Sequence, residues 1–175
     1  MEMTTKQVHD ILKVVAWIVF VGLCVEAGAK LVAVTISLFV SPEGASNLYK
    51  GADFTALYEY SSIHFGIMAL LIILIPAMKA FLFYWVIRIT SNLDIARPFS
   101  KFNADLILTM SRISLQIGIT GFIADSYAGW LEKSDLKIPY EGGEMEYLFL
   151  AGILFVIVQV FNKGIELQNE SELTI

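Results

Sequence analysis

The sequence predicts an all-α integral membrane protein, a bundle of four hydrophobic helices that cross the bilayer. Of its 175 residues, 57% are hydrophobic and only 17% are charged, whereas soluble domains average about 45–50% apolar and about 25% charged residues. The apolar residues are concentrated in four segments, at about 11–40, 63–89, 104–131 and 145–165. The length is typical of one domain, so we expect a single transmembrane domain over residues 1–175.

The first three segments exceed the length of about 20 helical residues that a bilayer core of ~30 Å requires. The fourth is shorter, because its almost uninterrupted run from Tyr147 to Phe161 reaches that length only with flanking residues. A soluble four-helix bundle would carry charges along one face of each helix. Runs such as Met68–Met78 and Leu148–Val158 are apolar on all sides, which argues against that alternative.

Two of the connections have recognisable patterns. Residues 41–62 open with the turn signal Ser-Pro-Glu-Gly and continue with Phe54, Leu57, Tyr58 and Tyr60 at near-helical spacing. This spacing predicts either a short amphipathic helix on the outer surface or a helical start to the second span. Residues 132–146 contain Pro139 and two consecutive glycines, and we expect an irregular outer loop.

The distribution of Lys and Arg predicts that both termini are cytoplasmic, since positive residues are enriched on the cytoplasmic side of membrane helices. With the N-terminus inside, the inner side carries six such residues and the outer side three. The inner set is Lys6, Lys13, Arg88, Arg97, Lys101 and Lys163, and the outer set is Lys50, Lys133 and Lys137.

Composition also argues against several classes of function. The net charge of −5 argues against direct nucleic acid binding, which needs a dense Lys/Arg surface. Cys24 has no second cysteine to pair with, and His9 and His64 lack metal-ligand spacing. We therefore expect no metal and no cofactor. The chain has no His-Glu-x-x-His or Gly-x-Ser-x-Gly motif, so we do not expect an enzyme.

Charged residues inside the spans are the first set of candidate functional residues, because a charge near the bilayer centre costs at least ~2.5–3.5 kcal/mol. At 1.5 Å per residue, Glu26 lies ~18 Å and Lys79 ~13 Å from the inner edge. A lysine stem can span the remaining ~5 Å, so we expect an interhelical Glu26–Lys79 ion pair. Lys30 follows Glu26 by four residues, the favourable order on one helix face.

The third segment carries a polar stripe that includes Arg112 and Gln116 and that should face protein or water, not lipid. Arg112 lies at a depth similar to that of Gln159, as Lys30 does to Asp125. The predicted network either fixes the packing of the four helices or lines a polar cavity for a ligand, an ion or a proton. Its members are Glu26, Lys30, Lys79, Arg112, Gln116, Asp125 and Gln159.

Two short motifs resemble a known family. The inner segment Ile95-Ala96-Arg97-Pro98-Phe99, with Asn103 beyond it, resembles a small-residue-Pro-Phe signature between the second and third helices. The tail from Lys163 to Ile175 resembles an ending of Gly-x-x-Leu, acidic residues and Leu-Thr-Ile. Both are similar to the bacterial domain-of-unknown-function family 2975, proteins with four predicted membrane helices. The resemblance implies a bacterial inner membrane protein, and it suggests a Cro/CI-like helix-turn-helix regulator as a partner. It implies no catalytic residues.

The inner connection and the acidic tail are the second set of candidates, as a docking site for a cytoplasmic partner. Aromatic and Arg residues are favoured as interface anchors, and an acidic tail would attract a basic regulator. The alternative is that both segments only seat helix ends at the interface, with the two Phe side chains in lipid. The residues are Arg97, Pro98, Phe99, Lys101, Phe102, Glu166, Glu170 and Glu172.

Two functions remain open at this point. The first is a membrane-embedded regulatory or sensor protein that docks a cytoplasmic partner, possible partners including the helix-turn-helix regulator. The second is a small transporter or channel that uses Glu26, Lys79 and Arg112. Four helices without an inverted repeat would require a homo-oligomer for transport, and a ridge of small residues offers a close-packing surface for one: Ala29, Ala33 and Ser37.

Overall fold

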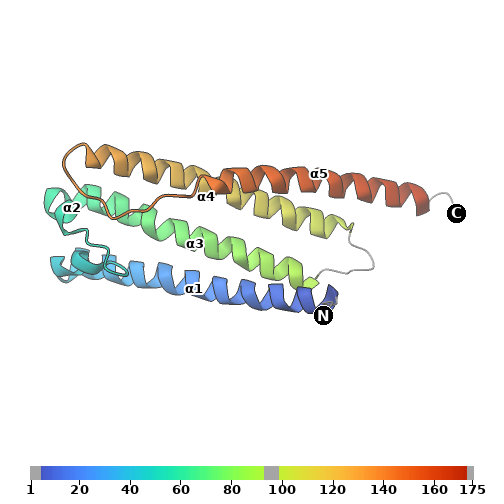
Figure 1. Cartoon of the computed structure of the whole chain (residues 1–175), viewed down its shortest axis with the longest axis horizontal. Coiled ribbons are helices and arrows are strands. Elements are labelled where there is room, and N and C mark those ends of the chain that lie inside the picture. The colour runs from blue at the N-terminus through green and yellow to red at the C-terminus, as the bar shows by residue number, and fades with distance from the viewer. Residues whose placement is uncertain (1–4, 93–98, 173–175) are drawn as a thin grey trace.

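In the computed structural model, all of the long elements are helices. The structure describes residues 5–92 and 99–172. Four of its helices are long and apolar enough to cross a membrane, which confirms the predicted fold class. The elements, labelled in Figure 1, are α1 (Thr5–Phe39), η1 (Pro42–Asn47), α2 (Thr55–Tyr60), α3 (Ser62–Asn92), α4 (Lys101–Glu132) and α5 (Glu146–Glu172).

The long helices follow one another in an open row. Helix α1 packs on α3, α3 on α4, and α4 on α5, whereas no contact joins α1 to α4 or α5 among the described elements. Both ends of the chain lie at the same end of the row (Figure 1), here called the terminal end. The opposite end, which carries η1 and α2, is called the loop end. The row leaves most of α1 and α5 available to lipid or to other chains.

The helices are longer than the apolar segments that predicted them. Helix α1 begins at Thr5 and α5 continues to Glu172, because polar residues extend a helix beyond the bilayer core without cost. Ser100 starts α4 by accepting a hydrogen bond from the amide of Asn103 at 3.2 Å. Ser61 adopts an extended conformation between α2 and α3. The predicted aromatic segment is therefore a separate short helix and not the start of the second span.

The best-packed part of the molecule lies at the loop end. Its core joins Val34 of α1, Leu57 of α2, Phe65 of α3, Leu131 of α4 and Ile138 of the following loop. The small-residue ridge of α1 contributes to this packing within the chain. Its third member, Ser37, is buried, and its first two are partly buried. The chain itself therefore covers part of the ridge, and a contact between copies at this ridge stays a prediction.

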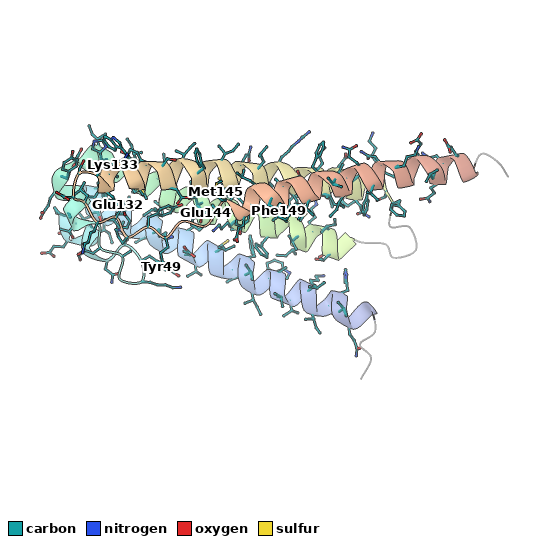
Figure 2. The ribbon with its side chains drawn as sticks, turned by 45° about the horizontal axis from the view of Figure 1, so that its top comes forward. Tyr49, Glu132, Lys133, Glu144, Met145 and Phe149 are labelled. Atoms are coloured by element: carbon teal, nitrogen blue, oxygen red, sulfur yellow. The ribbon has the colours of Figure 1, made fainter. Side chains whose placement is uncertain are left out.

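The connection between α4 and α5, residues 133–145, turns back along the molecule, and we call it the strap. Glu144 of the strap lies against Gly121, and Leu148 of α5 lies against Gly118. A Cβ at Gly121 would collide with the strap, and a Cβ at Gly118 would collide with α5. Gly121 precedes Glu132 by eleven residues, about 16 Å of helix. Helix α5 thus begins part way along α4, as the positions of Glu144 and Met145 in Figure 2 show.

This starting point explains the short fourth apolar run. Helix α5 does not need to reach the loop end, because the strap covers the remaining distance. Irregular backbone at membrane depth is tolerated where it is buried in protein or lines a water-filled cavity. The strap meets that condition, since Ile138 joins the core and Glu144 is buried.

Candidate functional site

A cavity of 640 Å³ lies at the loop end, between α1 and α3 on one side and the strap and the η1–α2 connection on the other. Its lining includes three acids and three bases. Within the lining, this balance leaves no net charge to attract a simple ion. The six residues are Glu26, Lys30, Lys50, Lys79, Glu141 and Glu144.

Lys79 of α3 pairs with Glu144 of the strap at the floor of this cavity. The Nζ–Oε1 distance is 2.9 Å, and the side chains are 23% and 8% exposed. The predicted Glu26–Lys79 pair is therefore wrong. Glu26 and Lys79 do line the same cavity, as their similar depth along the helices suggested. The strap, however, brings an acid closer to Lys79 than α1 does.

Two tyrosines complete the surroundings of this ion pair. The Tyr140 hydroxyl donates a hydrogen bond to Oε2 of Glu144 at 2.9 Å, so each carboxylate oxygen has its own donor. The Lys79 ammonium lies 5.2 Å from the centroid of the Tyr147 ring. Burial and the hydrogen bond to Glu144 raise the pKa of the Tyr140 hydroxyl well above its usual range. Tyr140 therefore remains a donor at physiological pH.

A second ion pair lies on the α1 wall of the cavity. Lys30 Nζ lies 2.6 Å from Oε1 of Glu26, the pairing within one helix that their spacing predicted. The same ammonium faces the Tyr49 ring at 5.5 Å. Asp125, which shares a depth with Lys30 in the sequence-based scheme, lies instead against Gly142 of the strap. It contributes a second carboxylate beside the strap.

Pro76 adds a polar backbone group to the cavity. A proline has no amide hydrogen, so Pro76 cannot donate to the carbonyl of Ile72 as the helix pattern would require. Both residues line the cavity. A carbonyl freed in this way is tolerated at membrane depth where it faces water or another polar group.

The remaining members of the predicted network do not join this site. Arg112 and Gln116 on α4 and Gln159 on α5 have exposed side chains, so these three residues do not join the predicted polar network within the chain. The reason is the open row, in which α4 has neighbours on two sides and an uncovered third side. Nearer the loop end the stripe turns toward α3, where Tyr127 hydrogen-bonds His64 at 2.6 Å.

The docking residues at the terminal end divide into two groups. Phe99 packs on α5, with its ring 5.3 Å from that of Phe161 in an edge-to-face arrangement, and it also contacts Gly164. It packs the start of α4 against α5. Lys101 and Phe102 are exposed. Arg97 and Pro98 lie outside the described residues, and so does the side chain of Glu172.

The acidic tail is a helical continuation of α5. Glu166 pairs with Lys163 at 2.7 Å, and both side chains are more than half exposed. Leu167 and Glu170 are also exposed. Gly164 contacts Phe99 at the start of α4, and eight residues of α5 follow it, about 12 Å of helix. In Figure 1 this extension projects past the end of α4.

Sequence reasoning missed Tyr140, Glu144 and Tyr147. One signal could have found them: the fourth apolar run is too short to span the bilayer, and acids come directly before it. A helix that begins inside the membrane brings the residues before it to membrane depth. Those residues are then candidates for partners of a buried lysine.

No family model, curated protein or solved structure matches this chain. The resemblance to domain-of-unknown-function family 2975 therefore stays a prediction. Among the described residues there is no group of three or more His, Cys, Asp or Glu side chains that could hold a metal ion.

Proposed function

We propose that the chain is a small membrane-embedded sensor of regulatory function, with a ligand site at the loop end and a partner site at the terminal end. The charge distribution supports cytoplasmic termini and so an inner-face partner. The family resemblance supports a bacterial inner membrane location and a helix-turn-helix regulator as that partner. The charged cavity supports the recognition of a ligand from the opposite side.

The observation that carries this proposal is the position of α5. Its first residue, Glu146, follows Glu144 by two residues, so the helix begins at the floor of the charged cavity. The same helix ends in the exposed acidic extension. Any ligand that separates Glu144 from Lys79 would free the start of α5. A rigid helix would carry the change to its other end.

The acidic extension has the chemistry expected of a docking segment for a basic protein. Glu166 and Glu170 are four residues apart, on one face of the helix, with exposed Leu167 beside them. Helix-turn-helix regulators are basic where they contact DNA. Binding of the extension to that surface would compete with DNA and hold the regulator at the membrane.

Transport is a second candidate, supported by the charged cavity and by the exposed stripe of Arg112 and Gln116. The described helices form an open row that encloses no passage, so one copy would not suffice. A homo-oligomer joined through the polar stripe would bury side chains that are costly in lipid. The sensor explains more of the structure, because it uses the acidic extension as well as the cavity.

The test of the sensor is capture of a Cro/CI-like helix-turn-helix regulator, the partner that the family resemblance suggests. The tagged full-length protein should retain it during purification, and a chain that ends at Gly164 should not. Glu166→Gln with Glu170→Gln should weaken capture on the order of tenfold, with a smaller salt dependence. The matched control, Glu59→Gln with Glu132→Gln, makes the same charge change at the loop end but outside the cavity lining, and it should leave capture unchanged. Equal capture by all chains would remove the role of the extension.

A further inference from the structure

We propose that the ligand is a long-chain carboxylate, whose head group replaces Glu144 at Lys79 and whose chain lies in an apolar groove between α3 and α5. This inference rests on the proposed sensor function, because it names the ligand of the same cavity. Three observations carry it: a ready-made carboxylate site, an adjoining apolar groove, and the alignment of the two along one face of α3.

The carboxylate site is the set of donors around Glu144. Lys79 Nζ and the Tyr140 hydroxyl each lie 2.9 Å from a different oxygen of this carboxylate. One side chain therefore receives one charged and one neutral donor in a largely buried position. The same two donors would suit the carboxylate of a free acid. Glu144 occupies the site as an internal ligand.

The apolar groove begins directly beyond Tyr147. It has a volume of 380 Å³, and its lining is apolar apart from Glu146 and the Tyr147 hydroxyl. Glu146 is exposed and lies on the first turn of α5. Helix α3 forms one wall and α5 the other, with α4 between them. The apolar lining residues are Leu82, Phe83, Val86, Met110, Leu150 and Leu154.

The two parts are continuous. Tyr147 lines the groove, and its ring faces the Lys79 ammonium at 5.2 Å. On α3, Leu82, Phe83 and Val86 follow Lys79 by three, four and seven residues, which places all four on one helix face. Lys79 thus stands at the junction between a charged cavity and an apolar groove, the arrangement that fits a molecule with an anionic head and an apolar chain.

The exchange of one carboxylate for another also explains why the ligand should be an acid. A buried lysine left without a counter-ion is strongly unfavourable. A neutral or cationic ligand that displaced Glu144 would leave Lys79 in that state, whereas a carboxylate keeps both of its donors satisfied. Glu144 would then move into the charged cavity. Gly143 has a φ of +130°, a conformation that favours glycine and gives the strap a turn beside the residue that moves.

Binding of radiolabelled hexadecanoate to the purified full-length protein in a neutral detergent tests the proposal. Glu144→Gln removes the charged internal competitor and should raise the affinity by about tenfold. Lys79→Met combined with Glu144→Gln leaves no unpaired charge, so this chain should fold, and it should lose binding. Lys133→Met, which removes an exposed lysine outside the cavity lining, should bind within about twofold of the unchanged protein. The methyl ester of hexadecanoate should not compete.

A photoreactive group at the end of the acyl chain should label α3 or α5 within the groove, at peptides that contain Phe83, Val86 or Leu154. Equal binding by Glu144→Gln and by the double variant would overturn the proposal, and so would competition by the methyl ester. Binding of a radiolabelled lysophospholipid without binding of hexadecanoate would also overturn the proposal and would assign the site to another lipid class. The sensor function is tested separately by regulator capture, so loss of hexadecanoate binding with intact capture would reject only the ligand.

Discussion

Lys79 and Glu144 form an ion pair with an Nζ–Oε1 distance of 2.9 Å although 65 residues separate them in the sequence. The pair joins the middle of α3 to the strap and thereby fixes where α5 begins. It also closes the floor of the charged cavity. The fold, the proposed ligand site and the proposed link to the far end of the molecule therefore depend on one contact.

The ion-pair partner of Lys79 can be identified by comparing the thermal stability of variants. Lys79→Met leaves Glu144 buried without its counter-ion and should destabilise the protein by about 3–5 kcal/mol. Adding Glu144→Leu should recover much of that loss, whereas adding Glu26→Leu should not, because Glu26 pairs with Lys30. Thermal unfolding in detergent measures all three variants. Rescue by Glu26→Leu alone would restore the pairing that depth along the helices suggested.

The close approach of the strap to α4 requires Gly121. A leucine there would occupy the space of the Glu144 side chain, and overpacking of this kind typically costs about 1–3 kcal/mol. Gly129→Leu is the matched control on the same helix, because a Cβ at Gly129 meets no neighbour. Gly121→Leu should lower the unfolding temperature and Gly129→Leu should not. Equal effects of the two substitutions would mean that the strap does not pack on α4.

Because of Tyr140, the free energy of unfolding should fall in alkaline solution. The pKa of its hydroxyl is raised in the folded protein by burial and by Glu144, so above pH ~10 the unfolded chain loses a proton that the folded chain keeps. Stability is then lost as pH rises, because the folded state binds more protons. Tyr140→Phe should show a shallower loss between pH 9 and about 11 when unfolding is measured across that range. An unchanged slope would contradict the hydrogen bond to Glu144.

The orientation can be checked by labelling. After replacement of Cys24 by serine, a cysteine introduced at Ser134 should react with an impermeant thiol reagent applied from outside the inner membrane. A cysteine at Ser100 should react only after the membrane is opened. The reverse pattern would place the termini outside and would remove the cytoplasmic partner from the proposal.

Hydropathy and residue spacing predicted the features that depend only on residues close together in the sequence. The apolar segments gave four spans, and the spacing of Phe54 and Leu57 gave α2. The pairing of Glu26 with Lys30 followed from their separation by four residues on one helix. The partner of Lys79 could not be found in this way, because it depends on the path of an irregular strap with no periodicity of its own. The exposure of Arg112 likewise depends on how many neighbours α4 has, which hydropathy does not encode.

The central claim is that the cavity at the loop end is coupled to the acidic extension through α5. The most direct measurement is regulator capture by Glu144→Gln, which weakens the tie between the strap and Lys79 without changing the terminal end. We expect its affinity for the regulator to differ from that of the unchanged protein by about tenfold, within the usual range of coupling between distant sites. Glu141→Gln, on the same strap and in the same cavity but without a bond to Lys79, should have no effect. If Glu144→Gln and Glu141→Gln both capture the regulator with unchanged affinity, the two ends of the molecule are not coupled and the sensor account is contradicted.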